Sequence, residues 1–139
     1  SIGVSNFEAE HLDRVMAEGV PPAVNQIELH PTFAQFDLVD ANTSRGIATQ
    51  SWRPLGHGED LDNPTVAGIA AATGKTPAQV VLRWHLQRGL IVFPKSRQPH
   101  RVTENLDVFD FELTPDQMAA INALDAGNRM GGDPRVFAG

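Results

Sequence analysis

Apolar positions along the chain alternate between short continuous runs and residues at helical spacing. Four runs predict strands, at residues 1–5, 23–29, 47–52 and 90–94, and each is followed by a helical pattern. The last run, Leu90-Ile91-Val92-Phe93-Pro94, is apolar throughout, as is typical of a strand buried on both faces of a parallel sheet. The pattern therefore predicts four strand–helix units, followed by an extra helix and a glycine-rich tail.

Residues typical of helix starts precede these helical patterns. Asn6 is expected to cap the first helix, and Thr32 with Gln35 forms a capping box for the second. Thr76 and Gln79 form a further box. The predicted helices run from Asn6 to Gly19, from Thr32 to Gly46, over about residues 65–73, from Thr76 to Gly89, over about residues 99–106, and from Thr114 onward.

Strands that alternate with helices predict an α/β fold with a parallel sheet and right-handed crossovers. Four such strands could form a small open sheet, or half of a (β/α)8 barrel, which needs about 250 residues. The chain opens directly in a strand, and this favours the half barrel. We expect one domain over residues 1–139, with the barrel units and final helix in 1–125 and a tail in 126–139.

Composition narrows the class of protein. The 139 residues are 41% hydrophobic and 20% charged, as in a globular domain. A net charge of -6 argues against a nucleic-acid or membrane surface, and the lack of cysteine excludes disulfides, thiol catalysis and thiolate zinc sites. No apolar run approaches the roughly 18 residues of a membrane span, and no signal peptide opens the chain, so a cytoplasmic location is expected.

A cluster of cations follows the fourth predicted strand. Lys95, Arg97, His100 and Arg101 fall within seven residues, at the start of a helix. Cations there oppose the helix dipole, so the cluster indicates an anion, and helix amino termini bind phosphate. A solvated basic patch is an equally good interpretation of the local pattern.

Polar and aromatic residues end the other strands. The Trp52 ring could lie against a planar ligand, although a core or rim aromatic is the more common case. Ser5, Asn6 and Gln26 offer the donors and acceptors that a carboxamide needs. His30, close to Glu28, fits a general base, although a structural role is more common at such a position.

The remaining histidines give no pattern for catalysis or metal binding. His85 is expected to be structural, and His11 to lie on a helix surface. The chain has no H-x-x-x-H pair and no cluster of carboxylates in sequence, so no metal site is predicted.

Four strings in the chain, GVSNF, AVNQIELHP, SWRPLGHG and FPKSRQPHRVTENLDVFDFELT, resemble the aldo-keto reductases in order and spacing. The likeness is greatest to the bacterial branch that contains the 2,5-diketo-D-gluconic acid reductases, and it covers residues 1 to about 125. It implies a (β/α)8 barrel that transfers a hydride from NADPH to an aldehyde or ketone. This chain would supply the last four strand–helix units.

The resemblance also implies a nicotinamide site. Ser5, Asn6 and Gln26 match the residues that hold the carboxamide. Trp52 matches the aromatic on which the nicotinamide ring stacks, which is tryptophan in this bacterial branch. Arg53 stands where the family pattern has a small residue, and it is expected to contact phosphate or substrate.

The phosphate and adenine contacts are assigned by the same motifs. They are Leu55, Gly56 and His57 in the loop over the pyrophosphate; Lys95, Ser96, Arg97 and Arg101 at the adenosine 2'-phosphate; and Glu104 and Asn105 at the adenine. A 2'-phosphate is the anion that the basic cluster indicates, and its contacts with cations favour NADPH over NADH.

The family's catalytic aspartate, tyrosine, lysine and histidine come from the first half of the barrel, and this sequence contains no tyrosine. The chain alone is therefore expected to be inactive and to require the N-terminal half. Arg129 and Arg135 in the tail are expected to border the substrate pocket and to favour acidic sugars. Two alternatives are a non-catalytic NADP(H)-binding module and a phosphosugar-binding half barrel that dimerises.

Overall fold

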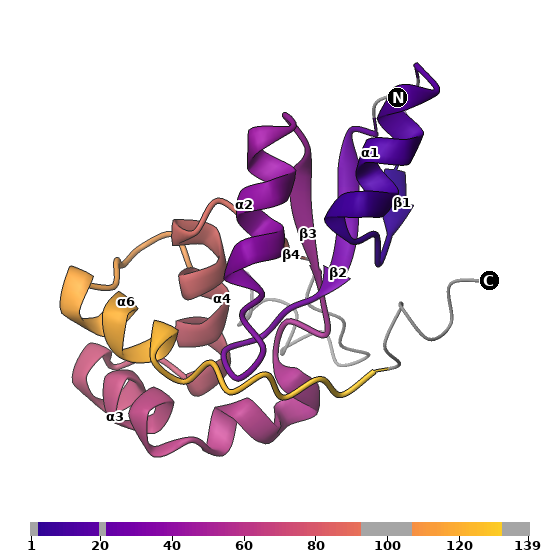
Figure 1. Ribbon diagram of the computed structural model, residues 1–139. Helices are drawn as coiled ribbons and strands as arrows, with labels where there is room; N and C mark the ends of the chain where they lie inside the picture. Colours follow the sequence, from indigo (N-terminus) through magenta and orange to yellow (C-terminus); the bar gives the residue numbers. More distant parts are fainter. Residues whose placement is uncertain (1–2, 20–21, 93–106, 132–139) are drawn as a thin grey trace.

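The computed structural model describes residues 3–19, 22–92 and 107–131, and strands and helices alternate along them as predicted (Figure 1). The strands are β1 (Gly3–Ser5), β2 (Val24–Glu28), β3 (Ala48–Trp52) and β4 (Ile91–Val92). The helices are α1 (Ala9–Ala17), α2 (Phe36–Ser44), the 3-10 helix η1 (Gly56–Asp62), α3 (Pro64–Thr73), α4 (Pro77–Gln87) and α6 (Pro115–Asn122). The helix predicted over residues 99–106 lies outside the described residues.

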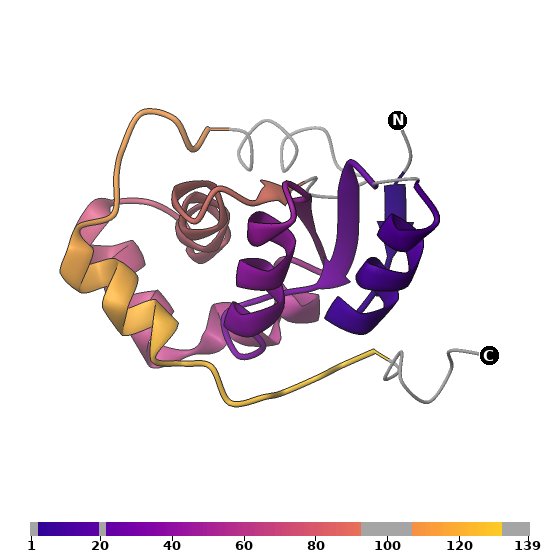
Figure 2. The same cartoon turned by 45° about the horizontal axis from the view of Figure 1, so that its top comes forward.

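The four strands form one parallel sheet in the order β1-β2-β3-β4. Neighbours in sequence are therefore neighbours in the sheet, as in a barrel that is built up unit by unit. Figure 2 shows α1 and α2 side by side along the sheet, with α4 next to β4. Because all four strands run parallel, their carboxyl ends lie at the same edge of the sheet.

The core lies between the sheet and the helices. Ile27 of β2 and Leu29 just beyond it are fully buried, and they belong to one apolar cluster with Val81 and Trp84 of α4. Helices α3 and α6 close this cluster through Val66 and Ile121. The apolar positions at helical spacing thus face the sheet, which leaves its other face to polar residues.

Two predicted helix starts are confirmed and two are wrong. The Thr76 hydroxyl accepts from the Gln79 amide at the start of α4, and Thr114 begins α6 in the same way. Helix α1 has Glu8 as its N-cap instead of Asn6, because Asn6 takes a left-handed conformation (φ 58°) that ends β1.

The predicted box of Thr32 and Gln35 does not form. Both side chains have tertiary partners: the Thr32 hydroxyl donates to Asp60 at 2.8 Å and the Gln35 amide donates to the Glu28 carbonyl at 2.6 Å. The prediction that His11 lies on the helix surface is also wrong. Its ring is only 18% exposed, and its Nδ1 accepts from the Glu8 amide at 3.0 Å. For Thr32, local pattern cannot anticipate the competing carboxylate of Asp60, 28 residues away.

Within the described ranges, no helix has the length and apolar content needed to cross a membrane.

Candidate functional site

A row of polar side chains lies on the face of the sheet opposite the core. The strand register places Ser5 beside Gln26, and Gln26 beside Gln50. Residues in register on parallel strands point to the same face, and so do residues two apart on one strand. Trp52 therefore projects from the same face as Gln50, one step nearer the carboxyl edge. The structure thus places Ser5, Gln26 and Trp52 on one face of the sheet.

The backbone of Asn6 joins this row. Its N–H donates to the Gln26 carbonyl at 2.6 Å, and the Ser5 hydroxyl lies 3.4 Å from the Gln26 side-chain oxygen. Asn6 is exposed, and its side-chain amide has no hydrogen-bond partner among the described residues. Since Asn6 does not cap α1, its amide is available to a ligand at this edge.

The turn after Asn6 is held by Asn25, a residue that the sequence interpretation missed. The fully buried Asn25 side chain accepts from the Phe7 amide at 3.2 Å and donates to the Phe7 carbonyl at 2.8 Å. It also donates to Asn42 of α2, which donates in turn to Thr49 of β3. The only sequence signal was a polar residue at a core-facing position of a strand.

Trp52 ends β3 and is half-buried. Arg53 has a left-handed backbone (φ 53°), which turns its side chain back so that the guanidinium carbon lies 4.3 Å from the centre of the Trp52 ring. This is a cation–π contact. Arg53, expected at phosphate or substrate, thus lies beside the aromatic ring that the resemblance assigns to nicotinamide.

The segment predicted to fold over pyrophosphate begins η1. Gly56 has φ 58°, and a Cβ added there would lie 2.9 Å from the Asp60 carboxyl carbon, so both conformation and space require glycine. Leu55 packs against the core, and His57 follows in η1. The predicted phosphate and adenine contacts Lys95, Ser96, Arg97, Arg101, Glu104 and Asn105 lie outside the described residues.

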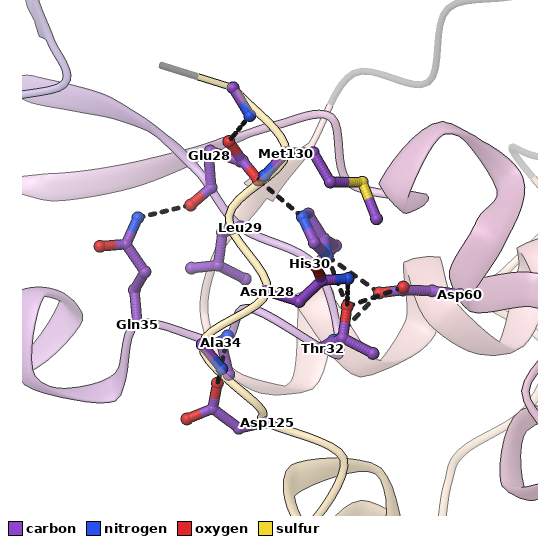
Figure 3. A network of polar contacts seen from close by, with 12 residues as sticks. Glu28, Leu29, His30, Thr32, Ala34, Gln35, Asp60, Asp125, Asn128 and Met130 are labelled. Atoms are coloured by element: carbon purple, nitrogen blue, oxygen red, sulfur yellow. Dashed lines mark hydrogen bonds and ion pairs between the residues drawn. The ribbon is translucent and has the colours of Figure 1, made fainter. Parts of the chain in front are cut away.

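A buried ionisable network lies behind the strand ends (Figure 3). The fully buried His30 ring has Nε2 2.8 Å from Glu28 and Nδ1 2.9 Å from Asp60. Burial lowers the pKa of His30, but the hydrogen bonds to Asp60 and Glu28 outweigh it and the pKa is raised. Both ring nitrogens face carboxylate oxygens, which supports the structural interpretation of His30 over a general base.

The two carboxylates are held in their charged form. Burial raises the pKa of Glu28, but hydrogen bonds from Met130, His30 and Gly131 lower it below its usual value. Asp60 behaves similarly, because His30 and Thr32 donate to it and outweigh its burial. The His30 ring lies between two carboxylates, an arrangement that favours its protonated form. In residues 3–19, 22–92 and 107–131, no group of His, Asp or Glu is arranged to hold a metal ion.

The tail after α6 returns to this network. The Ala126 and Asn128 amides each donate to the Thr32 carbonyl at 3.0 Å. Arg129, expected near the substrate pocket, places its guanidinium carbon 4.6 Å from the centre of the Phe33 ring. Arg135 lies outside the described residues.

An open depression of about 370 Å³ lies where this tail passes the start of α2. Its lining is Glu8, Phe33, Gln35, Phe36, Asp37, Leu38, Asp125, Gly127 and Arg129. None of the predicted cofactor residues belongs to this depression, so it does not mark the strand-end site.

Comparison with known proteins decides the family. The model of the Aldo/keto reductase family matches residues 1–126. The chain belongs to this family. An aldo-keto reductase of Mycolicibacterium smegmatis is 55% identical over 138 residues, which cover 99% of this chain and 50% of that protein. The methylglyoxal reductase DkgA of Escherichia coli is 49% identical and is covered to 52%.

Solved structures of reductases agree with this membership. The apoform of Gox0644 has a TM-score of 0.93 and 57% identity, covering 96% of this chain and 50% of that chain. A variant of Gox0644 solved in complex with NADPH gives the same TM-score, with 56% identity over 97% of this chain and 51% of that one. The fold is therefore that of the aldo-keto reductase barrel, and the chain spans about half the length of the curated relatives it matches.

The residues at the strand ends fit a reductase cofactor by their chemistry. A carboxamide needs both donors and acceptors, and the hydroxyl of Ser5 with the amides of Asn6 and Gln26 supplies both. A planar cationic or neutral ring is well matched by a half-buried indole such as Trp52. Ser5, Gln26 and Trp52 lie on one face of the sheet, which the core helices leave uncovered.

Proposed function

We propose that this chain is the cofactor-binding portion of an NADPH-dependent reductase of aldehydes and ketones. The observation that carries the proposal is the row of Ser5, Gln26 and Trp52 on one face of the sheet, next to Asn6, whose side-chain amide has no partner in the described part of the chain. Family membership and a relative solved with NADPH support it.

Each residue has a defined task in this proposal. Ser5, Asn6 and Gln26 hydrogen-bond the carboxamide and so fix the rotation of the nicotinamide ring. Trp52 supports one face of that ring and leaves the other free for the carbonyl substrate. NADPH, when bound, supplies the hydride. The protein's contribution on this side is orientation.

The phosphate end of the cofactor falls to other segments. Arg53 and the turn formed by Leu55, Gly56 and His57 would meet the pyrophosphate. The basic segment with Lys95, Ser96, Arg97 and Arg101 would bind the 2'-phosphate, and Glu104 and Asn105 the adenine. Because a phosphate dianion forms charge-assisted hydrogen bonds with lysine and arginine, this end would select NADPH over NADH.

A second half of the barrel completes the enzyme in this proposal. The matched relatives are about twice as long, and this sequence has no tyrosine to act as the general acid. The N-terminal half would supply the catalytic tetrad and pair with the open edges of β1 and β4, which otherwise remain exposed. Residues 1–125 would form the last four barrel units, with 126–139 as tail, and the chain alone would not turn over.

The substrate class in this proposal is a small carbonyl compound, including keto-sugar acids. Two relatives are methylglyoxal reductases. Arg129 and Arg135 in the tail would favour a carboxylate on the substrate.

The test separates the two ends of the cofactor. Gln26→Ala is expected to weaken NADPH and NADH equally, because both carry the carboxamide. Lys95→Ala combined with Arg101→Ala is expected to weaken NADPH by a few kcal/mol and to leave NADH almost unchanged. Dissociation constants are measured by titration of the intact protein, by which we mean this chain together with the proposed N-terminal half. The control is Arg14→Ala, which removes an exposed cation on α1.

Other outcomes identify the alternatives. Binding of a sugar phosphate without binding of either dinucleotide would indicate the phosphosugar half barrel. Binding of NADPH by the intact protein without reduction of any carbonyl would indicate a module that senses or stores NADP(H). Equal loss of both cofactors in the Lys95/Arg101 variant would contradict the assignment of the 2'-phosphate.

A further inference from the structure

The tail of the chain is hydrogen-bonded to a single buried carboxylate. The Met130 amide donates to Glu28 Oε2 and the Gly131 amide to Glu28 Oε1, each at 2.6 Å. Glu28 is 1% exposed and ends β2, about a hundred residues earlier in the chain. Figure 3 shows the tail passing across this carboxylate. Such short contacts to a charged acceptor are strong hydrogen bonds.

The carboxylate is itself fixed from behind. The His30 ring hydrogen-bonds Glu28 at 2.8 Å and Asp60 at 2.9 Å, and the Thr32 amide and hydroxyl both donate to Asp60. Thr32 also contacts the tail, because its carbonyl accepts from Ala126 and Asn128. We call the four residues Glu28, His30, Thr32 and Asp60 the clasp. The clasp contacts the tail at two points, and both of its carboxylates are hydrogen-bonded to the His30 ring.

The clasp places the tail directly against Trp52. A Cβ added to Gly131 would lie 2.6 Å from Cζ3 and 2.9 Å from Cη2 of the Trp52 ring. It would also lie 2.9 Å from Glu28 Oε1. The backbone of Gly131 is not in the left-handed region, so glycine is required here by space and not by conformation. The same carboxylate that holds the tail thus sets how closely it approaches the indole.

We propose that the clasp positions the tail over the edge of Trp52, and that Glu28 is a positioning residue for substrate at the reductase site. The inference rests on the proposed function, because Trp52 matters here as the support for nicotinamide. Glu28 acts through Met130 and Gly131 without touching the reacting atoms. Releasing the tail would widen the space beside Trp52 where the carbonyl compound enters, and would leave the phosphate contacts of the cofactor unchanged.

Two variants of the intact protein test the clasp, one by changing the carboxylate Glu28 and the other by changing the tail at Gly131. Glu28→Gln replaces one acceptor oxygen with an amide, which then faces a donor and cannot hold both tail N–H groups. Gly131→Ala removes no buried group but forces the tail away from Trp52. The matched control is Gly68→Ala, on α3, where an added Cβ has nothing within 4 Å.

The first readout needs neither cofactor nor activity. The protein is labelled with 5-fluorotryptophan, and its ¹⁹F NMR signals are assigned with Trp52→Phe. The Trp52 signal is expected to shift in Glu28→Gln and in Gly131→Ala, and to stay in place in Gly68→Ala. The signal of the fully buried Trp84 reports on the core and is expected not to move. A Trp52 signal that is unmoved in both variants would overturn the proposal.

The second readout separates positioning from stability. The KM for methylglyoxal is expected to rise roughly tenfold in both variants, while the dissociation constant of NADPH changes by less than about twofold. A shifted Trp52 signal with an unchanged KM would also overturn the proposal. If Glu28→Gln moves the Trp84 signal as well, its core is disturbed and Gly131→Ala decides. Failure of the wild-type protein to bind NADPH would refute the proposed function, whereas the NMR comparison would still test the clasp.

Discussion

Single buried polar residues shape the candidate site as much as the exposed ones do. Asn25 is fully buried, yet it fixes the backbone of Phe7 through both its amide and its carbonyl. Asn6, which precedes this turn, has a left-handed backbone (φ 58°) and follows the carboxyl end of β1. A buried amide with all its partners in place is a strong local constraint.

We expect Asn25→Ala to lower the free energy of unfolding by about 1–3 kcal/mol, because it leaves the Phe7 and Asn42 groups without their partner. It should also weaken binding of NADPH and NADH equally, since Asn6 loses its fixed position. Urea denaturation and cofactor titration measure the two effects. Thr43→Ala, on the exposed side of α2, is the control, and equal destabilisation by both variants would refute this role of Asn25.

At the scale of helices and strands, local patterns predicted whatever had local partners. The strands were found from apolar runs, and the α4 box formed because Thr76 and Gln79, three residues apart, hydrogen-bond each other's backbone amides. The predicted box at Thr32 failed because Asp60, 28 residues away, takes its hydroxyl. Sequence spacing does not reveal such distant carboxylates.

Helix α4 carries a buried histidine whose ionisation should limit stability in acid. Burial lowers the pKa of His85 to about 4, although its ring contacts the Val81 and Leu29 carbonyls; Arg88 and His30 add repulsion. In the unfolded chain His85 takes up a proton near its ordinary pKa of about 6.5, whereas in the folded chain it stays neutral down to about pH 4. The contribution of neutral His85 to the free energy of unfolding is therefore complete above pH 6.5 and decreases as pH falls toward 4.

The expected loss is at most about 3 kcal/mol between these pH values, from the size of the pKa shift. Chemical denaturation at a series of pH values measures it. His85→Gln should flatten this part of the curve, because glutamine has no proton to gain. The lowered pKa values of Glu28 and Asp60 add a further loss only at lower pH. An unchanged slope in His85→Gln would contradict the assignment.

At the scale of the whole molecule, sequence order predicted the architecture but not the clasp. Four strand–helix units imply neighbouring parallel strands, and the sheet order follows from that rule. The strand-end residues Ser5, Gln26 and Trp52 were identified for the same reason, because parallel strands end at one edge. The pairing of Glu28 with Met130 depends on where a tail about a hundred residues away comes to rest, which no local pattern encodes.

The division of labour between the two halves of the barrel is the central claim, and it concerns where the chemistry occurs. This chain carries the row that fits a nicotinamide, but its sequence has no tyrosine. Cofactor binding should therefore belong to residues 1–139, and proton donation to the other half.

The most direct test is the rate of NADPH oxidation with methylglyoxal as substrate, measured for residues 1–139 alone and for the intact protein. Circular dichroism of the shorter chain accompanies it, to establish that helices are present. We predict carbonyl-dependent oxidation by the intact protein and none by residues 1–139. Turnover by residues 1–139 alone would contradict the account, because the general acid would then have to lie within this chain.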